Sequence, residues 1–136
     1  MVALDQLADS LLHELTSAFP QRSVYGLWLY GSQANGEARP DSDVDLAVLC
    51  DAPLDPVALF DMSGRLAAQL GTAVDLVDLR QAGGLLRVEA THRGKPLLCP
   101  TIQADLFSTH ALADHAAFAR NRQAATQAFK ERHHAR

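Results

Sequence analysis

The sequence has no long apolar segment and little excess of charge of either sign. No stretch approaches the roughly 20 consecutive apolar residues that a membrane-spanning helix needs. The net charge is −4 over 136 residues, whereas a nucleic-acid-binding protein usually presents a basic face. We therefore expect neither a membrane protein nor direct binding of nucleic acid.

Cysteine is also scarce, with only Cys50 and Cys99 in the chain. So few cysteines do not make a disulfide framework, and we expect two free, buried thiols in a reducing cytoplasm. The first fifteen residues, MVALDQLADSLLHEL, include acidic residues and contain no unbroken apolar run. A signal peptide is therefore not expected either, and the sequence predicts a cytoplasmic protein.

The spacing of apolar residues predicts a single α/β domain with a core of its own. Hydrophobic residues make up 48% of the chain and charged residues 21%, which is typical of a globular protein. Helices are expected at residues 2–19, 56–70, 85–93 and 102–132, and strands at residues 24–30, 44–49, 73–79 and 95–98. Residues 1–100 should form the core, and residues 101–136 a helical segment of the same domain. The apolar face of this segment is thin, which favours docking on a partner.

The residues that carry chemistry lie in one stretch, YGSQANGEARPDSDVDLAVL, at residues 30–49. Gly31 and Ser32 follow one expected strand, and Asp43 and Asp45 stand at the start of the next. Because strand side chains alternate, the two aspartates project to the same side. They repel each other by about 4 kcal/mol at a separation of about 4 Å and a dielectric constant of about 20. Magnesium would neutralise them, since it accepts one or two carboxylates together with substrate phosphates.

A third carboxylate is available on the strand AVDLVDL at residues 73–79. Asp75 and Asp78 lie on opposite faces of this strand, so only one of them can join Asp43 and Asp45. Alternation by itself does not say which one.

The order Gly-Ser, ten residues, Asp-x-Asp resembles the mark of the polymerase-β-type nucleotidyltransferase superfamily. The longer stretch GSQANGEARPDSDVDLAVL is similar to the minimal nucleotidyltransferases of prokaryotes. The resemblance implies a polymerase-β-like core, with a small mixed sheet, flanking helices and a C-terminal helix. It implies that Asp43 and Asp45 bind two Mg²⁺ ions, and that Gly31 and Ser32 seat the phosphates of ATP.

The resemblance also bears on residues other than the four fixed ones of this motif. The third carboxylate of the family matches Asp75, which would ligate metal and take the proton of the attacking hydroxyl. Asp78 is then expected to face solvent at the end of its strand. In the loop, Arg39 and Ser42 are candidate nucleotide contacts. Arg39 could also reach an acidic group of a partner, or equally be a solvated loop residue. Gln33 stands where many relatives carry a basic residue, so the triphosphate contacts depart from the family pattern.

Small stand-alone proteins of this family resemble the antitoxins of HEPN–MNT toxin–antitoxin pairs. This resemblance implies transfer of AMP from ATP to a tyrosine hydroxyl of a cognate HEPN ribonuclease toxin, which silences the toxin. Two alternatives stay open. The protein could adenylylate a small aminoglycoside, or it could neutralise its toxin by binding alone, with vestigial catalysis.

Overall fold

The structure, a computed structural model, describes residues 3–31, 34, 43–99 and 101–134. Helices and strands alternate along the chain, as the spacing of apolar residues predicts. The elements are α1 (Leu4–Ala18), β1 (Val24–Tyr30), β2 (Val44–Cys50), α2 (Pro56–Leu70), β3 (Val74–Asp78), α3 (Gly84–Val88), the π-helical turn η2 (Glu89–Arg93), β4 (Lys95–Pro96) and α4 (Ile102–His134).

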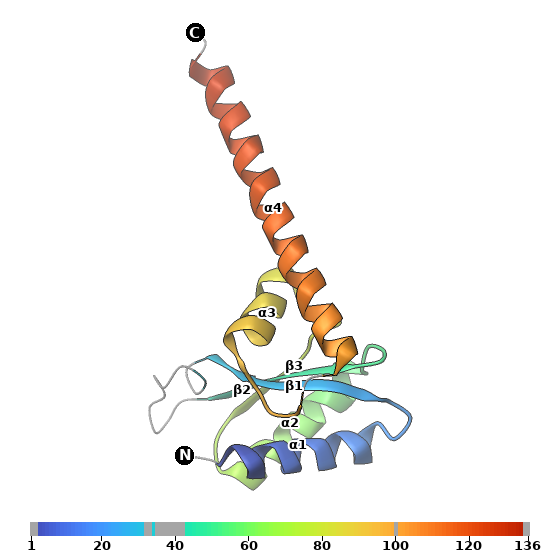
Figure 1. Cartoon of the computed structure of the whole chain (residues 1–136). Helices are drawn as coiled ribbons and strands as arrows, with labels where there is room; N and C mark the ends of the chain where they lie inside the picture. Colours follow the sequence, from blue (N-terminus) through green and yellow to red (C-terminus); the bar gives the residue numbers. More distant parts are fainter. Residues whose placement is uncertain (1–2, 32–33, 35–42, 100, 135–136) are drawn as a thin grey trace.

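The four strands form one mixed sheet in the order β3-β2-β1-β4. Strand β1 pairs antiparallel with β2 and with β4, whereas β2 and β3 are parallel. Figure 1 shows α1 and α2 on one face of this sheet, and α3 and the start of α4 on the other. The small mixed sheet with flanking helices is therefore confirmed, and β3 lies at an edge of it.

The core has two parts, one on each face of the sheet. The first joins α1 and α2 to the strands through fully buried residues such as Leu11, Leu46 and Met62. The second joins α3, η2 and α4 to the opposite face through residues such as Ala47 and Ala104. Because β1 and β2 are covered on both faces, their sequences are nearly continuous apolar runs.

Helix α4 packs on its own domain only near its N-terminus. Thr101 caps it by accepting a hydrogen bond from the Ala104 N–H at 3.0 Å, and donates one to the Tyr25 carbonyl at 2.9 Å. The Arg87 guanidinium lies 5.1 Å from the centre of the Phe107 ring. Beyond these turns, the helix extends away from the sheet (Figure 1). The predicted division at residue 100 stays a prediction. Among the described helices, none combines the length and apolarity needed to cross a membrane.

Asp78 lies inside the domain, so the prediction that it faces solvent is wrong. Its side chain is only 3% exposed. One carboxylate oxygen accepts a hydrogen bond from the Leu54 N–H at 2.8 Å, and the other accepts one from the Arg80 N–H at 3.0 Å. The acid therefore stabilises two chain turns, one after β2 and one after β3, instead of solvating the end of a strand.

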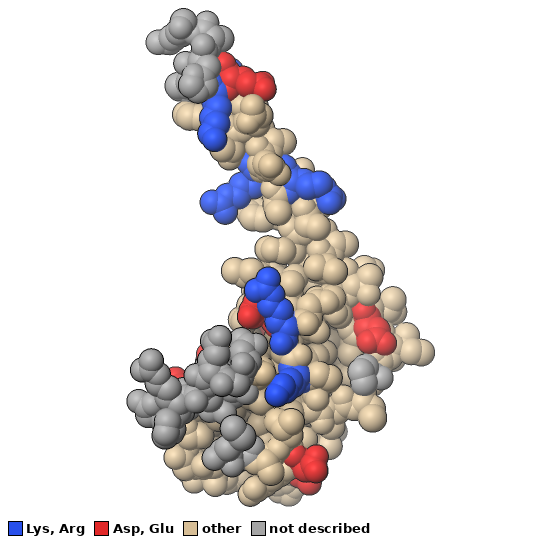
Figure 2. All heavy atoms as spheres, turned by 60° about the vertical axis from the view of Figure 1, so that its left-hand side comes forward, with Lys and Arg blue, Asp and Glu red and all other residues tan. Residues whose placement is uncertain are grey.

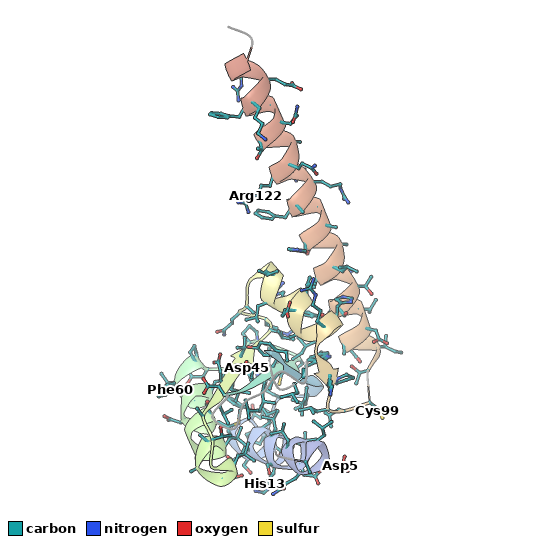
Figure 3. The ribbon with its side chains drawn as sticks, turned by 90° about the vertical axis from the view of Figure 1, so that its left-hand side faces the viewer. Asp5, His13, Asp45, Phe60, Cys99 and Arg122 are labelled. Carbon is teal, nitrogen blue, oxygen red and sulfur yellow. The ribbon has the colours of Figure 1, made fainter. Side chains whose placement is uncertain are left out.

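The two cysteines differ in exposure, so the prediction of two buried thiols is correct only for Cys50. Cys50 is fully buried, and its pKa is raised to about 11 by burial and then by the nearby Asp78 and Asp51 carboxylates. Cys99 is exposed, and Figure 3 shows it at the base of α4, beside the body of the domain. The chain thus has one accessible thiol and one protected thiol.

We expect a thiol reagent such as DTNB to modify one cysteine of the native protein quickly. The fast thiol should be Cys99, because the thiolate is the reactive form and Cys50 is both buried and protonated at mildly alkaline pH. Cys50 should react only after unfolding in denaturant. Replacement Cys99→Ser should remove the fast phase, and rapid reaction of both thiols in the native protein would contradict the buried position of Cys50.

Candidate active site

A row of polar side chains crosses the sheet at one end. Asp45 on β2 is in register with Asp75 on β3 and with Tyr30 on β1. All three belong to the face that α3 and α4 cover, because Tyr30 and Ala47 share the second core cluster. The parallel register brings Asp75, and not Asp78, beside Asp45. Asp43 precedes Asp45 by two residues, at the entry to β2.

The electrostatics of this row are dominated by negative charge. The pKa of Asp45 is raised first by burial and then by the Asp75 and Asp43 carboxylates. The pKa of Tyr30 is raised to about 12, by burial and then by Asp75 and Asp45. The charged groups that shift both pKa values are all carboxylates, so the row is suited to receive a cation.

The donors of this row fit magnesium in their chemistry. Asp43, Asp45 and Asp75 offer hard carboxylate oxygens, which Mg²⁺ prefers. Within the described part of the chain, no three His, Cys, Asp or Glu side chains come close enough to hold a metal ion by themselves. Magnesium does not require such a closed cage, because one or two carboxylates and substrate phosphates commonly complete its shell.

Gly31 adjoins this row and is required there for two reasons. Its φ is +72°, a conformation that residues with a side chain rarely adopt. A Cβ added to Gly31 would also collide with the Asp45 carboxylate. Of the other predicted nucleotide contacts, Ser32, Arg39 and Ser42 lie outside the described residues, as does Gln33, so their roles stay predictions.

A cleft of about 420 Å³ opens beside the carboxylates, along the edge strand β3 and against α2. Asp43 and Asp75 line it together with Phe60, Ser63 and Gln81. The Ser63 hydroxyl donates to the Val74 carbonyl at 2.6 Å, while the Phe60 ring is exposed and projects outward from α2 (Figure 3). A substrate can therefore reach the two carboxylates from the open edge of the sheet.

Tyr30 is the member of this row that the sequence pattern does not identify. In the sequence it is one more apolar residue at the end of a strand, directly before Gly31. The signal that could have found it is the antiparallel pairing of β1 with β2, which places the last residue of β1 opposite Asp45.

Comparison with known proteins identifies the family. The family model for "Polymerase beta, Nucleotidyltransferase" matches residues 13–103. The chain is 34% identical over 98 residues to the protein adenylyltransferase MntA of Shewanella oneidensis. These aligned residues cover 72% of this chain and 70% of that protein.

Solved structures agree with this match along most of the chain. A chain of a toxin–antitoxin structure with AMP-PNP has a TM-score of 0.76 and 30% identity, covering 88% of this chain and 95% of that chain. A chain from the complex of tri-AMPylated Shewanella oneidensis HEPN toxin with MNT antitoxin has a TM-score of 0.72 and 28% identity, covering 92% and 97%. The resemblance carried by the Gly-Ser and Asp-x-Asp motif is confirmed, and the chain belongs to the polymerase beta nucleotidyltransferase family.

Proposed function

We propose that this protein is an antitoxin that transfers AMP from ATP to a tyrosine hydroxyl of a cognate HEPN ribonuclease toxin. The observation that carries the proposal is the row of Asp45 and Asp75, with Asp43 beside it, next to the glycine of the Gly-Ser motif. The relatives support the choice of acceptor, because one is named a protein adenylyltransferase and another is bound to an AMPylated HEPN toxin. ATP and a ribonuclease meet in the cytoplasm, where we place the reaction.

Asp43, Asp45 and Asp75 would hold the magnesium, and we propose two ions by the family pattern. Held by these carboxylates, magnesium would supply positive charge against the triphosphate and the leaving pyrophosphate. The backbone N–H groups of Gly31 and Ser32 would receive oxygens of the β and γ phosphates. Arg39 and Ser42 are further candidates for contacts with the nucleotide.

Asp75 would take the proton of the incoming tyrosine. A tyrosine hydroxyl has a pKa of about 10, so it is neutral at physiological pH and must lose its proton to attack. Asp75 is exposed on the edge strand and lines the cleft, where an acceptor side chain can approach. A well-placed general base contributes about 10²- to 10⁴-fold to the rate.

The bond changes are those of a simple displacement. The tyrosine oxygen forms a bond to the α-phosphorus of ATP, and the bond from that phosphorus to the oxygen bridging to the β-phosphate breaks. Pyrophosphate leaves, and the hydroxyl proton passes to Asp75. The product is a tyrosine carrying a negative phosphodiester and a bulky adenosine, which would repel RNA phosphates at the toxin's own site.

We expect ATP to bind much more weakly when magnesium is replaced by a chelator. The triphosphate would then meet the unneutralised carboxylates of Asp43, Asp45 and Asp75, and the repulsion should cost at least about 1.4 kcal/mol, or tenfold in affinity. Isothermal titration calorimetry with ATP in magnesium and in EDTA measures the difference. Equal affinities in the two buffers would show that magnesium has no role in ATP binding.

Labelled ATP distinguishes the proposed reaction from its alternatives. The protein is incubated with magnesium and ATP labelled at the α or the γ phosphate, with either a cognate HEPN ribonuclease or an aminoglycoside as acceptor. We expect α label, and no γ label, on the HEPN protein. Label on the aminoglycoside alone would favour an antibiotic-type transferase. An unlabelled but inhibited HEPN protein would favour an antitoxin that acts by binding.

A further inference from the structure

Helix α4 carries phenylalanines at a regular spacing of eleven residues, at Phe107, Phe118 and Phe129. Eleven residues are about three turns plus 20° of an α-helix, so the three rings lie on one face. Ala111 and Ala125 lie within about 20° of the same line. We call this line, from Phe107 to Phe129, the phenylalanine stripe.

The stripe begins as an internal contact and continues as an exposed surface. Phe107 packs against the core cluster that holds Tyr30 and Ala47, and Ala111 is buried as well. Farther along the helix, Phe118 is 64% exposed and Phe129 is 55% exposed. The helix face that docks on the domain thus continues outward with side chains of the same kind.

The outer part of the helix, residues 112–134, rises from the sheet face that carries Asp45 and Asp75. Residues 112–134 add about 35 Å of helix beyond Ala111, which is buried. Figure 1 shows this part extending past α3, well clear of the sheet. A protein seated on it would therefore be held on the side of the sheet where the carboxylates lie.

The charge of this outer part is opposite to that of the chain before it. Residues 112–134 contain four Lys and Arg against two Asp and Glu, a net charge of +2, and residues 1–111 have a net charge of −7. Arg122 and Arg132 lie about 40° to either side of the stripe. Figure 2 shows basic side chains projecting from the outer half of the helix, and Figure 3 shows Arg122 there.

These features select one kind of occupant. The same segment of a second copy would bring two basic helices together, which like charge disfavours. A stripe with one aromatic ring every three turns is too narrow to bury in a membrane surface. An acidic protein surface with pockets for two aromatic rings satisfies both the apolar and the basic side chains.

We propose that Phe118 and Phe129 are the anchors by which the acceptor protein docks, with its acidic side chains facing Arg122 and Arg132. This inference rests on the proposed function, because the occupant is the HEPN protein that receives AMP. Docking on α4 holds the acceptor outside the catalytic cleft, and it leaves Asp45 and Asp75 free for the chemistry.

The test uses the double variant Phe118→Ala/Phe129→Ala of the full chain and follows AMP transfer against the concentration of the HEPN protein. We expect KM for that protein to rise by about 10- to 100-fold, with kcat unchanged at saturation. The matched control is Leu106→Ala/Leu112→Ala, since these side chains are 55% and 46% exposed on α4 but lie about 120° from the stripe. The control should leave KM within about twofold.

A charge-reversal variant, Arg122→Glu/Arg132→Glu, should also raise KM by about tenfold at low salt, and less at high salt. Unchanged KM in the phenylalanine variant would overturn the docking surface. If the protein alone forms a dimer, and only the phenylalanine variant is monomeric, the stripe is instead the interface with a second copy. Binding of single-stranded RNA that only the arginine variant loses would assign it to nucleic acid.

Failure of the docking surface can be told apart from failure of the proposed function. If the wild-type protein transfers AMP with the same KM as the phenylalanine variant, only the docking surface fails. If the wild-type protein transfers no AMP, the function fails. Calorimetry with the HEPN protein then still tests the docking surface. Weaker binding by Phe118→Ala/Phe129→Ala than by the wild-type protein supports it, and equal binding overturns it.

Discussion

Replacement of Asp75 by asparagine should reduce AMP transfer by at least about 100-fold, because the general base is lost. The free energy of unfolding should stay within about 0.5 kcal/mol of the wild-type value or increase. Asp75 is exposed on β3, and its charge repels Asp45 and raises the pKa of Tyr30. Removing that charge therefore relieves repulsion within the fold.

Replacement of Asp78 by asparagine, three residues away on the same strand, should have the opposite effect. The amide nitrogen cannot accept a hydrogen bond, so the N–H of either Leu54 or Arg80 loses its buried partner. We expect the free energy of unfolding to fall by about 1–3 kcal/mol, with the specific activity of the folded protein preserved.

Urea unfolding and transfer assays on both variants measure this contrast. Loss of activity in Asp78→Asn together with retained activity in Asp75→Asn would contradict the β2–β3 register on which the site depends.

Replacement of Gly31 by alanine should damage both the fold and the site. The left-handed conformation costs a residue with a side chain about 1–2 kcal/mol, and the new Cβ would displace the Asp45 carboxylate. We expect a fall in transfer of at least about 100-fold, since catalysis depends on positioning at the ångström level.

Gly71 is the matched control for this prediction. It has a φ of +70°, close to the +72° of Gly31, but a Cβ there would meet open space. Gly71→Ala should therefore lose a similar amount of stability from strain and keep its activity. If Gly31→Ala is as active as Gly71→Ala, Gly31 has a conformational role only, and its proximity to Asp45 does not matter for catalysis.

Local periodicity predicts the helices and strands and the placement of Asp43 beside Asp45, whereas the mixed sheet and the choice of Asp75 over Asp78 come from the family resemblance. The continuous apolar runs of β1 and β2 mark strands buried on both faces. The two-residue period of a strand places Asp43 and Asp45 together and separates Asp75 from Asp78. Local signals also mark helix ends: Asp55 caps α2 through the Ala58 N–H at 2.9 Å, and Gly71 ends it.

The errors concern what lies opposite a side chain, which a local pattern does not contain. Alternation tells that Asp78 turns away from Asp75, but not that the chain near Leu54, 24 residues earlier, supplies a buried N–H for it. Cys99 follows an apolar pair and would be buried in a longer strand, but β4 ends at Pro96. The role of Tyr30 depends on a cross-strand register, which the sequence of one strand alone does not fix.

AMP transfer to the HEPN protein is tested most directly by measuring the intact mass of that protein. It is incubated with ATP, magnesium and either the wild-type protein or Asp45→Asn. We expect AMP-sized mass increments with the wild-type protein, located on tyrosine by fragmentation, and none with Asp45→Asn. An HEPN protein that stays unmodified yet is inhibited equally by both proteins would contradict AMP transfer as the means of neutralisation.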